Sequence, residues 1–216
     1  MDLIEQIIEQ IKEEAKDFFS NAKGSHDWEH IERVYNLCMH IGKEESADIE
    51  VLKLAAILHD IGRKDQDESN GRICHAEKGA ILARELLEKH NLSREKIDEI
   101  VHCIECHRFR GNKIPQTKEA KVLFDADHLD QIGAVGVGRA FLFAGEIGAK
   151  LHNKDVDIEK TKPYTKEDTA FREFMVKLRK IKDRMFTQEG KRIAEERHRF
   201  MVNFFDRLNK EVDGAL

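Results

Sequence analysis

The sequence predicts an all-α protein, and three observations lead to that prediction. Apolar residues recur at spacings of three and four along most of the chain, which is the period of an amphipathic helix. The 216 residues include only 2 prolines and 13 glycines, so residues that interrupt helices are scarce. No segment shows the alternation of apolar and polar residues that is typical of a half-buried strand. We therefore expect a bundle of about eight to nine helices.

Five helices are expected in the first half of the chain. The first carries Ile4, Ile8 and Ile11 on one face. Short polar residues precede several of the others, where they can accept hydrogen bonds from the free N–H groups of the first turn. The expected ranges are residues 2–19, about 27–44 after Ser25 or Asp27, from Ser46 or Asp48 to Gly62, about 75–90, and about 94–107 after Ser93.

Four further helices are expected in the second half of the chain. The second of these is rich in glycine and alanine, which predicts close packing against its neighbours. The expected ranges are residues 119–131, 132–148, 167–186 and 188–211. Polar segments with turn-forming residues are expected to be loops, at residues 63–73, 108–118 and 150–166.

The length fits a single domain over residues 1–216, and a hydrophobic fraction of 40% is enough for one core. We expect that core at about residues 20–148. The helices within residues 166–212 are highly charged. They form either a subdomain or the outer layer of the same bundle.

The net charge and the lack of a long apolar run argue against several classes of partner. A net charge of −5 argues against a protein that coats long nucleic acid. A membrane span needs about 18 consecutive apolar residues, and the chain has no such run. The first residues carry acids where a secretion signal carries bases, so the 4 cysteines are expected to be reduced thiols of a cytoplasmic protein. A homodimer is left open.

The functional prediction is built around residues 54–63. An apolar run leads directly into His59 and Asp60, and Gly62 then interrupts it. Burial without a partner costs about 2–7 kcal/mol for a neutral polar group and far more for a charge. A bound metal ion would be a suitable partner for the pair.

Two further residues complete a candidate ligand set. His30 lies in the first turns of the second expected helix, and Asp127 interrupts the apolar pattern of the sixth. Two imidazoles and two carboxylates form a mixed nitrogen and oxygen site, which suits Mn²⁺, Fe²⁺, Co²⁺, Ni²⁺ or Zn²⁺, with Mg²⁺ as a further candidate. Water in the remaining positions would make the site catalytic rather than structural.

The ordered set His30, His59-Asp60 and Asp127 resembles the HD superfamily of metal-dependent phosphohydrolases, named for the adjacent His-Asp pair. The resemblance extends to the flanking sequences at residues 26–34, 58–63, 107–110, 125–127 and 194–200. It implies an all-helical HD domain around a buried divalent-metal site. Within the superfamily, the chain is similar to small stand-alone bacterial HD hydrolases that include nucleoside triphosphate pyrophosphohydrolases.

A phosphate substrate implies cationic partners near the metal, because basic side chains balance the charge of the transferring group. Arg63 and Lys64 directly follow the His-Asp pair. Asp65, or alternatively Asp67 or Glu68, is expected to act as a general base or to hold a water. The other basic residues expected to contact substrate are Arg33, Arg108 and Arg110.

His75 matches a further feature of the superfamily. In dinuclear members, a histidine with a glycine four residues later binds a second metal, and here Gly79 follows His75 at that spacing. His102 or His107 would be its companion. We expect one metal ion rather than two, with His75 and His107 contacting substrate or water.

The resemblance implies an enzyme that acts on nucleotides, and we expect cleavage of a nucleoside triphosphate to the monophosphate and pyrophosphate, with manganese among the candidate metals. The alternatives within the class are a 5′-nucleotidase-type phosphomonoesterase and a cyclic-nucleotide phosphodiesterase. Two alternatives lie outside it: a non-catalytic nucleotide-binding regulatory module, and a helical protein in which a metal only clamps helices. The expected partner is a small phosphorylated molecule.

Overall fold

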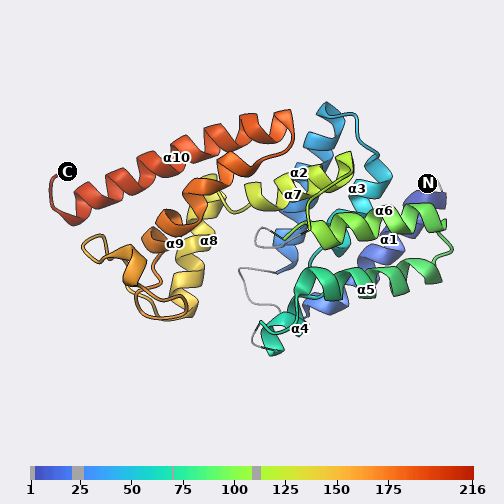
Figure 1. Ribbon diagram of the computed structural model, residues 1–216, viewed down its shortest axis with the longest axis horizontal. Helices are drawn as coiled ribbons and strands as arrows, with labels where there is room; N and C mark the ends of the chain where they lie inside the picture. The colour runs from blue at the N-terminus through green and yellow to red at the C-terminus, as the bar shows by residue number, and fades with distance from the viewer. Residues whose placement is uncertain (1–2, 21–26, 70, 109–112) are drawn as a thin grey trace. The chain divides into compact units, whose positions relative to one another are not determined.

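The computed structural model describes residues 3–20, 27–69, 71–108 and 113–216, and every regular element in those residues is a helix (Figure 1). The all-α prediction is therefore confirmed. The chain divides into two compact units, Met1–Asp127 and His128–Leu216.

The first unit is built around α3 (Ile49–Leu58), a helix that is apolar on all sides. Its residues from Val51 onward are buried except for Lys53. A helix of this kind needs cover on every side, and α1, α2 and α6 pack against it. The other helices of this unit are α1 (Leu3–Lys16), η1 (Asp17–Phe19), α2 (Trp28–Glu44), α4 (Arg63–Glu68), α5 (His75–Lys89), α6 (Arg94–Cys106) and α7 (Lys118–Leu129), whose last two residues are assigned to the second unit.

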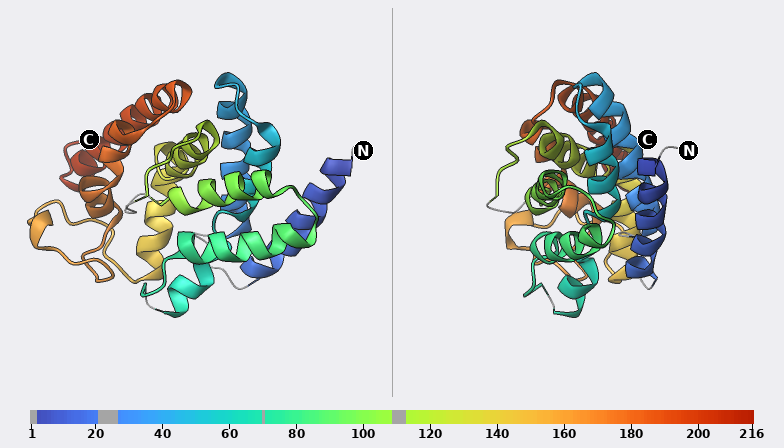
Figure 2. Two further views of the ribbon diagram at one scale, coloured as in Figure 1. Left: turned by 45° about the vertical axis from the view of Figure 1, so that its right-hand side comes forward. Right: turned by 90° about the vertical axis from the view of Figure 1, so that its right-hand side faces the viewer.

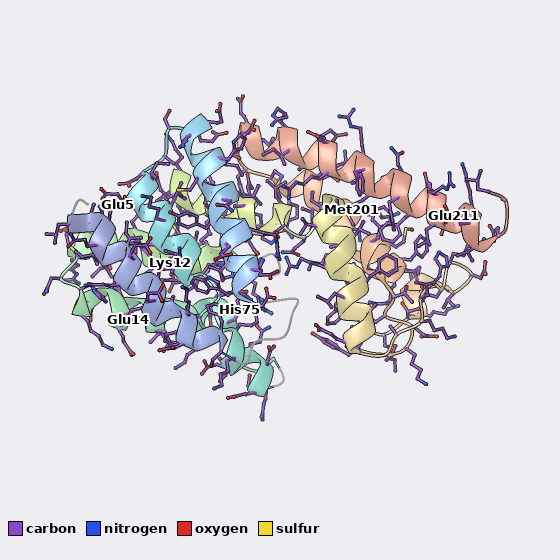
Figure 3. The ribbon with its side chains drawn as sticks, turned by 180° about the vertical axis from the view of Figure 1, so that it is seen from behind. Glu5, Lys12, Glu14, His75, Met201 and Glu211 are labelled. Atoms are coloured by element: carbon purple, nitrogen blue, oxygen red, sulfur yellow. The ribbon has the colours of Figure 1, made fainter. Side chains whose placement is uncertain are left out.

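Amphipathic α1 shows how the outer helices cover α3. Ile8 and Ile11 on one face are buried. The polar face carries Glu5, labelled in Figure 3, which forms an ion pair with Lys53 of α3. The apolar stripe provides the packing, and the ion pair lies at the rim of the contact.

Helices α5 and α6 lie side by side (Figure 2), and α5 also meets the turn that follows α3. At this second contact the backbones approach closely. A Cβ atom added at Gly62 would lie 2.4 Å from the carbonyl oxygen of His75 and 2.6 Å from the amide nitrogen of Gly79. The absence of a side chain at Gly62 therefore allows the start of α5 to lie against the segment that carries His59 and Asp60.

The second unit contains α8 (Gly133–Glu146), η2 (Ile158–Lys160), α9 (Ala170–Val176), η3 (Leu178–Arg184) and α10 (Gln188–Val212). Its apolar centre is Phe205 of α10, which is 1% exposed. The Phe205 ring stacks on Phe174 with ring centroids 4.5 Å apart, and it also contacts Phe141 and Phe171. Aromatic rings from three helices thus make a separate core for this unit.

A buried ion pair fixes the irregular segment before α9. The Arg172 guanidinium donates to Asp168 Oδ1 at 2.7 Å and to Thr161 Oγ1 at 2.5 Å. All three residues are less than 9% exposed. Residues 150–166, expected to be a loop, are therefore attached to the second core through Thr161.

The structure differs from the predicted elements in four places, one of which is the short helix η2 within the loop expected at residues 150–166. Helix α3 ends at Leu58 rather than Gly62, so His59 and Asp60 lie in the turn that follows it. Residues 63–68, expected in a loop, form α4, whose six polar residues contain no apolar stripe. The helix expected over residues 167–186 is divided into α9 and η3, because the backbone of Lys177 has φ −132° and ψ −59°.

A search of the described helices finds none with the length and apolarity needed to cross a lipid bilayer.

Candidate metal centre

The four predicted ligands come from three places in the first unit. His30 lies in the first turn of α2, where its backbone N–H donates to the side chain of the capping residue Asp27. His59 and Asp60 directly follow α3, and Asp127 lies on α7. All four are at most 8% exposed. Four polar side chains from three separate parts of the sequence are therefore buried in one unit.

His30, His59 and Asp127 form a first group of potential ligands, whose ligand atoms lie within 4.8 Å of one another. The Nε2 atom of His30 is 3.3 Å from Nε2 of His59 and 3.4 Å from Oδ1 of Asp127. The other ring nitrogen of His59, Nδ1, lies 2.8 Å from the carbonyl oxygen of Ala56. A carbonyl can only accept, so Nδ1 carries the proton and Nε2 presents its lone pair to the group.

Asp60, His75 and His107 form a second group within the same limit of 4.8 Å. Oδ1 of Asp60 is 3.5 Å from Nε2 of His75 and 3.6 Å from Nε2 of His107. Its other oxygen, Oδ2, lies 3.9 Å from Nε2 of His30 in the first group. The Asp60 carboxylate thus lies between the two groups, with one oxygen towards each.

Hydrogen bonds fix the tautomers of both histidines in the second group. Gln66 Oε1 accepts from the backbone N–H of His75 and lies 2.8 Å from Nδ1 of the same residue. Nδ1 of His107 lies 2.6 Å from the carbonyl oxygen of Ile104. Both Nδ1 atoms are therefore donors, and both Nε2 atoms are left as acceptors. Metal-binding histidines are commonly oriented by such a bond from the opposite ring nitrogen.

Burial and neighbouring charges together set the charge states of these groups. It lowers the pKa of His59 to about 4 and the pKa of His75 to about 2, so both imidazoles are neutral at pH 7. Burial raises the pKa of the Asp60 carboxyl, but the Arg63 guanidinium and other neighbours outweigh it and hold that pKa well below its usual range. Neutral imidazole and ionised carboxylate are the forms that bind metal ions.

A divalent cation fits the donor atoms that converge here. The Nε2 atoms of His75 and His107 are 3.1 Å apart. Because both present lone pairs, no hydrogen bond joins them, and a cation between them would remove the repulsion. The donor set of imidazole nitrogens and carboxylate oxygens suits a first-row transition metal, of which Mn²⁺ tolerates the most oxygen ligands.

Two other predicted site residues, Arg63 and Arg108, have contacts with the second group or with a residue next to it. Arg63 Nη2 is 2.9 Å from Asp60 Oδ1. Arg108 lies next to His107, and its Nη1 donates to Sγ of Cys74, the residue before His75.

Three predicted residues lie on helix surfaces, and one cannot be placed. Lys64 is exposed and 3.9 Å from Glu68, and Asp65 is 4.0 Å from Lys78. Arg33 lies 3.9 Å from Glu29 on the surface of α2. Arg110 lies outside the described residues.

Two residues of the second group and its surroundings could not be identified from the sequence. His102 and His107 were alternative companions of His75. The structure brings His107 to His75, whereas Nε2 of His102 accepts a hydrogen bond from the backbone of Gln116. Gln66, which orients His75, was not singled out, because one glutamine in a polar run carries no distinguishing pattern.

The helical fold and the buried imidazole and carboxylate groups define a class of proteins that can hold divalent metals between helices. The HD domain model matches residues 27–132, which include all the potential ligands. Bacillus subtilis YpgQ is 34% identical over 211 residues, covering 95% of this chain and 94% of YpgQ. The chain therefore belongs to the HD superfamily of metal-dependent phosphohydrolases.

Solved structures agree with this assignment. The structure of Bacillus subtilis YpgQ in complex with ADP matches with a TM-score of 0.75 at 31% identity, covering 96% of both chains. An HD-superfamily hydrolase from Bacillus thuringiensis matches with a TM-score of 0.76 at 27% identity, covering 97% of this chain and 98% of that one. The likeness extends over both units of this chain.

Proposed function

We propose that this protein hydrolyses nucleoside triphosphates to the nucleoside monophosphate and pyrophosphate, with Mn²⁺ as its metal. The observation that carries the proposal is the Asp60 carboxylate between two groups of buried ligand atoms. The ADP bound by YpgQ supports a nucleotide substrate, because YpgQ is similar to this chain over nearly its whole length. A small free nucleotide also suits a protein with a net charge of −5 better than long nucleic acid does.

In this proposal His30, His59 and Asp127 would hold one ion together with Asp60. His75 and His107, which the sequence predicts to contact substrate or water, would instead hold a second ion, and Asp60 would be shared between the two. An ion bound in this way lowers the pKa of a water towards neutrality and polarises a phosphoryl oxygen. Gln66 and the carbonyl groups of α3 and α6 keep the imidazole rings in the required tautomers.

The proposed reaction adds the oxygen of one water to the α-phosphorus and breaks the bond from that phosphorus to the bridging oxygen. Pyrophosphate leaves with the bridging oxygen, and the water gives up a proton. We propose Asp65 on α4, which is partly exposed, as the group that takes this proton. Asp67 and Glu68 remain the alternatives on the same helix.

Basic residues of the first unit are proposed to bind the phosphates. Arg108 is favoured because it directly follows His107 and its guanidinium lies beside Cys74, at the start of α5. Lys64 is proposed as a further contact, since an exposed pair at 3.9 Å from Glu68 holds it only weakly. Arg33 and Arg110 complete the proposed set. We also propose a cytoplasmic location, in keeping with the free cysteines.

The test is a panel of nucleoside tri-, di- and monophosphates and cyclic nucleotides, each with Mn²⁺, Mg²⁺, Co²⁺, Ni²⁺ or Zn²⁺ and with the products identified. We expect equal amounts of monophosphate and pyrophosphate from a triphosphate. Orthophosphate released only from monophosphates would contradict the proposal, and so would opening of cyclic nucleotides alone.

Variants connect the activity with the site. Asp60→Ala should lose bound metal and activity while its helical content, measured by circular dichroism, is retained. Asp98→Ala is the matched control, because Asp98 is a half-exposed carboxylate of α6 that pairs with Arg84. Arg108→Ala should keep its metal and lose affinity for the nucleotide. Stoichiometric metal in purified Asp60→Ala would contradict the assignment of the ligands.

A further inference from the structure

The Arg63 guanidinium lies within the second group of ligand atoms. Its Nη2 atom is 2.9 Å from Oδ1 and 3.0 Å from Oδ2 of Asp60. The same Nη2 atom is 3.3 Å from Nε2 of His75. A positively charged group of the chain itself thus contacts two of the three side chains that would bind the second ion.

The contact with His75 uses the lone pair that a metal would need. Nδ1 of His75 donates to Gln66, so Nε2 is an acceptor and takes its hydrogen bond from Arg63. An imidazole nitrogen has one lone pair in the plane of the ring. His75 can therefore either accept from Arg63 or bind a metal ion through Nε2.

The contact with Asp60 leads to the same conclusion. Arg63 approaches both carboxylate oxygens, through Nη2 and, at 3.3 Å, through Nε. A metal ion would lie about 2.0–2.2 Å from one of these oxygens. An ion that also bonded to His75 would use the same two acceptor atoms, Asp60 Oδ1 and His75 Nε2, that Nη2 now contacts. The guanidinium would then have to withdraw.

The Arg63 guanidinium and the second metal ion also have the same electrostatic role. The Asp60 side chain is 1% exposed, and a buried carboxylate needs a nearby positive charge. The guanidinium provides that charge in the described arrangement. Because an ion would replace it, the binding of the second ion includes the free energy of breaking the Arg63–Asp60 pair.

We propose that Arg63 competes with the second metal ion and so sets how many ions the site holds. This inference rests on the proposed role of Asp60, His75 and His107 as a second ion site, but it does not depend on which phosphate bond is cleaved. Arg63 is thus a residue that determines metal occupancy. It favours one tightly bound ion and makes the second depend on conditions that draw the guanidinium away.

The test measures Mn²⁺ binding to metal-free full-length protein without nucleotide, by isothermal titration calorimetry and by the electron paramagnetic resonance signal of coupled Mn²⁺ pairs. We expect the wild-type protein to bind a second Mn²⁺ at least tenfold more weakly than the first. In Arg63→Gln the second ion should bind at least tenfold more tightly than in wild type, and the coupled signal should appear at lower Mn²⁺ concentration. The first ion should be affected less.

Three further variants make the result specific. Arg63→Met removes the same charge with a different side chain, in case the glutamine variant does not fold. Arg72→Gln removes a charge from an exposed arginine before α5, and it should bind Mn²⁺ as wild type does. Adding His75→Ala to Arg63→Gln should abolish the gain, which assigns the gain to this group.

Second-ion binding that is unchanged or weaker in folded Arg63→Gln and Arg63→Met would overturn the inference. A tighter second ion in Arg72→Gln would also overturn it. Nucleotide is absent from the experiment, so a failure of the pyrophosphate assay would refute the proposed function and leave this result standing.

Discussion

The close backbone contact between Gly62 and α5 gives the sharpest prediction about how the fold supports the site. The perturbation is Gly62→Ala. The backbone at Gly62 has φ −87°, which any residue adopts, so the added methyl group acts through its size alone. It would lie 2.4 Å from the carbonyl oxygen of His75 and 2.6 Å from the amide nitrogen of Gly79, both of which are backbone atoms.

The structure sets the size of the effect. To reach an ordinary contact of 3.4 Å, the start of α5 would have to withdraw by about 1 Å. Overpacking that shifts backbone costs about 1–3 kcal/mol, which lowers the melting temperature of a protein of this size by about 2–12 °C. The shift also exceeds the tolerance of about 0.2 Å for metal–ligand distances, so binding through His75 should weaken at least about tenfold.

The matched control is Gly79→Ala at the other side of the same contact. Its methyl group would meet the nitrogen of Gly62 and the carbonyl oxygen of His59 at 3.4 Å, which is ordinary contact. Alanine also favours a helix interior over glycine, by up to about 1 kcal/mol. Thermal unfolding and Mn²⁺ titration of the two variants form the assay. Equal stability and equal Mn²⁺ binding of Gly62→Ala and wild type would refute the reasoning.

Three further predictions concern other parts of the chain. Gln66→Leu removes the acceptor that orients His75, so the second Mn²⁺ should bind about 10–100-fold more weakly by calorimetry, and unchanged affinity would count against the tautomer argument. Burial raises the pKa of the Cys103 thiol, so at pH 8 this thiol should react with a thiol reagent only after denaturation. Fast labelling of Cys103 in the native protein would contradict this. Arg172→Met leaves the Asp168 carboxylate buried without the guanidinium that pairs with it. The free energy of unfolding in urea should fall by about 3–5 kcal/mol, and Mn²⁺ binding should be retained. Wild-type stability of the variant would show that the ion pair is not needed.

The fold class could be predicted from the sequence because most helices have both an apolar stripe and a polar start. Asp48, for example, accepts from the backbone N–H groups of Glu50 and Val51, as expected of a capping residue. The short helix α4 could not be predicted, since none of its residues is buried. Its position depends on packing against α5, a tertiary contact that local patterns do not contain.

The candidate site, like the fold, could be predicted from the sequence only in part. His30, His59, Asp60 and Asp127 could be selected because of their residue types and settings and because their order along the chain resembles the HD superfamily, and the structure brings them together in the first unit. The choice between His102 and His107 could not be made, since it depends on how the last turn of α6 is placed. The sequence also gave no reason to expect that one residue, Arg63, would contact both Asp60 and His75.

The most direct test of the metal centre is a crystal structure of Mn²⁺-soaked protein, with anomalous diffraction used to locate the ion. We expect an anomalous peak about 2.0–2.3 Å from Nε2 of His30, Nε2 of His59 and a carboxylate oxygen of Asp127. Such a peak would establish that the buried imidazole and carboxylate groups are metal ligands. Protein that hydrolyses nucleotides with Mn²⁺ but shows no peak at this group would contradict the account.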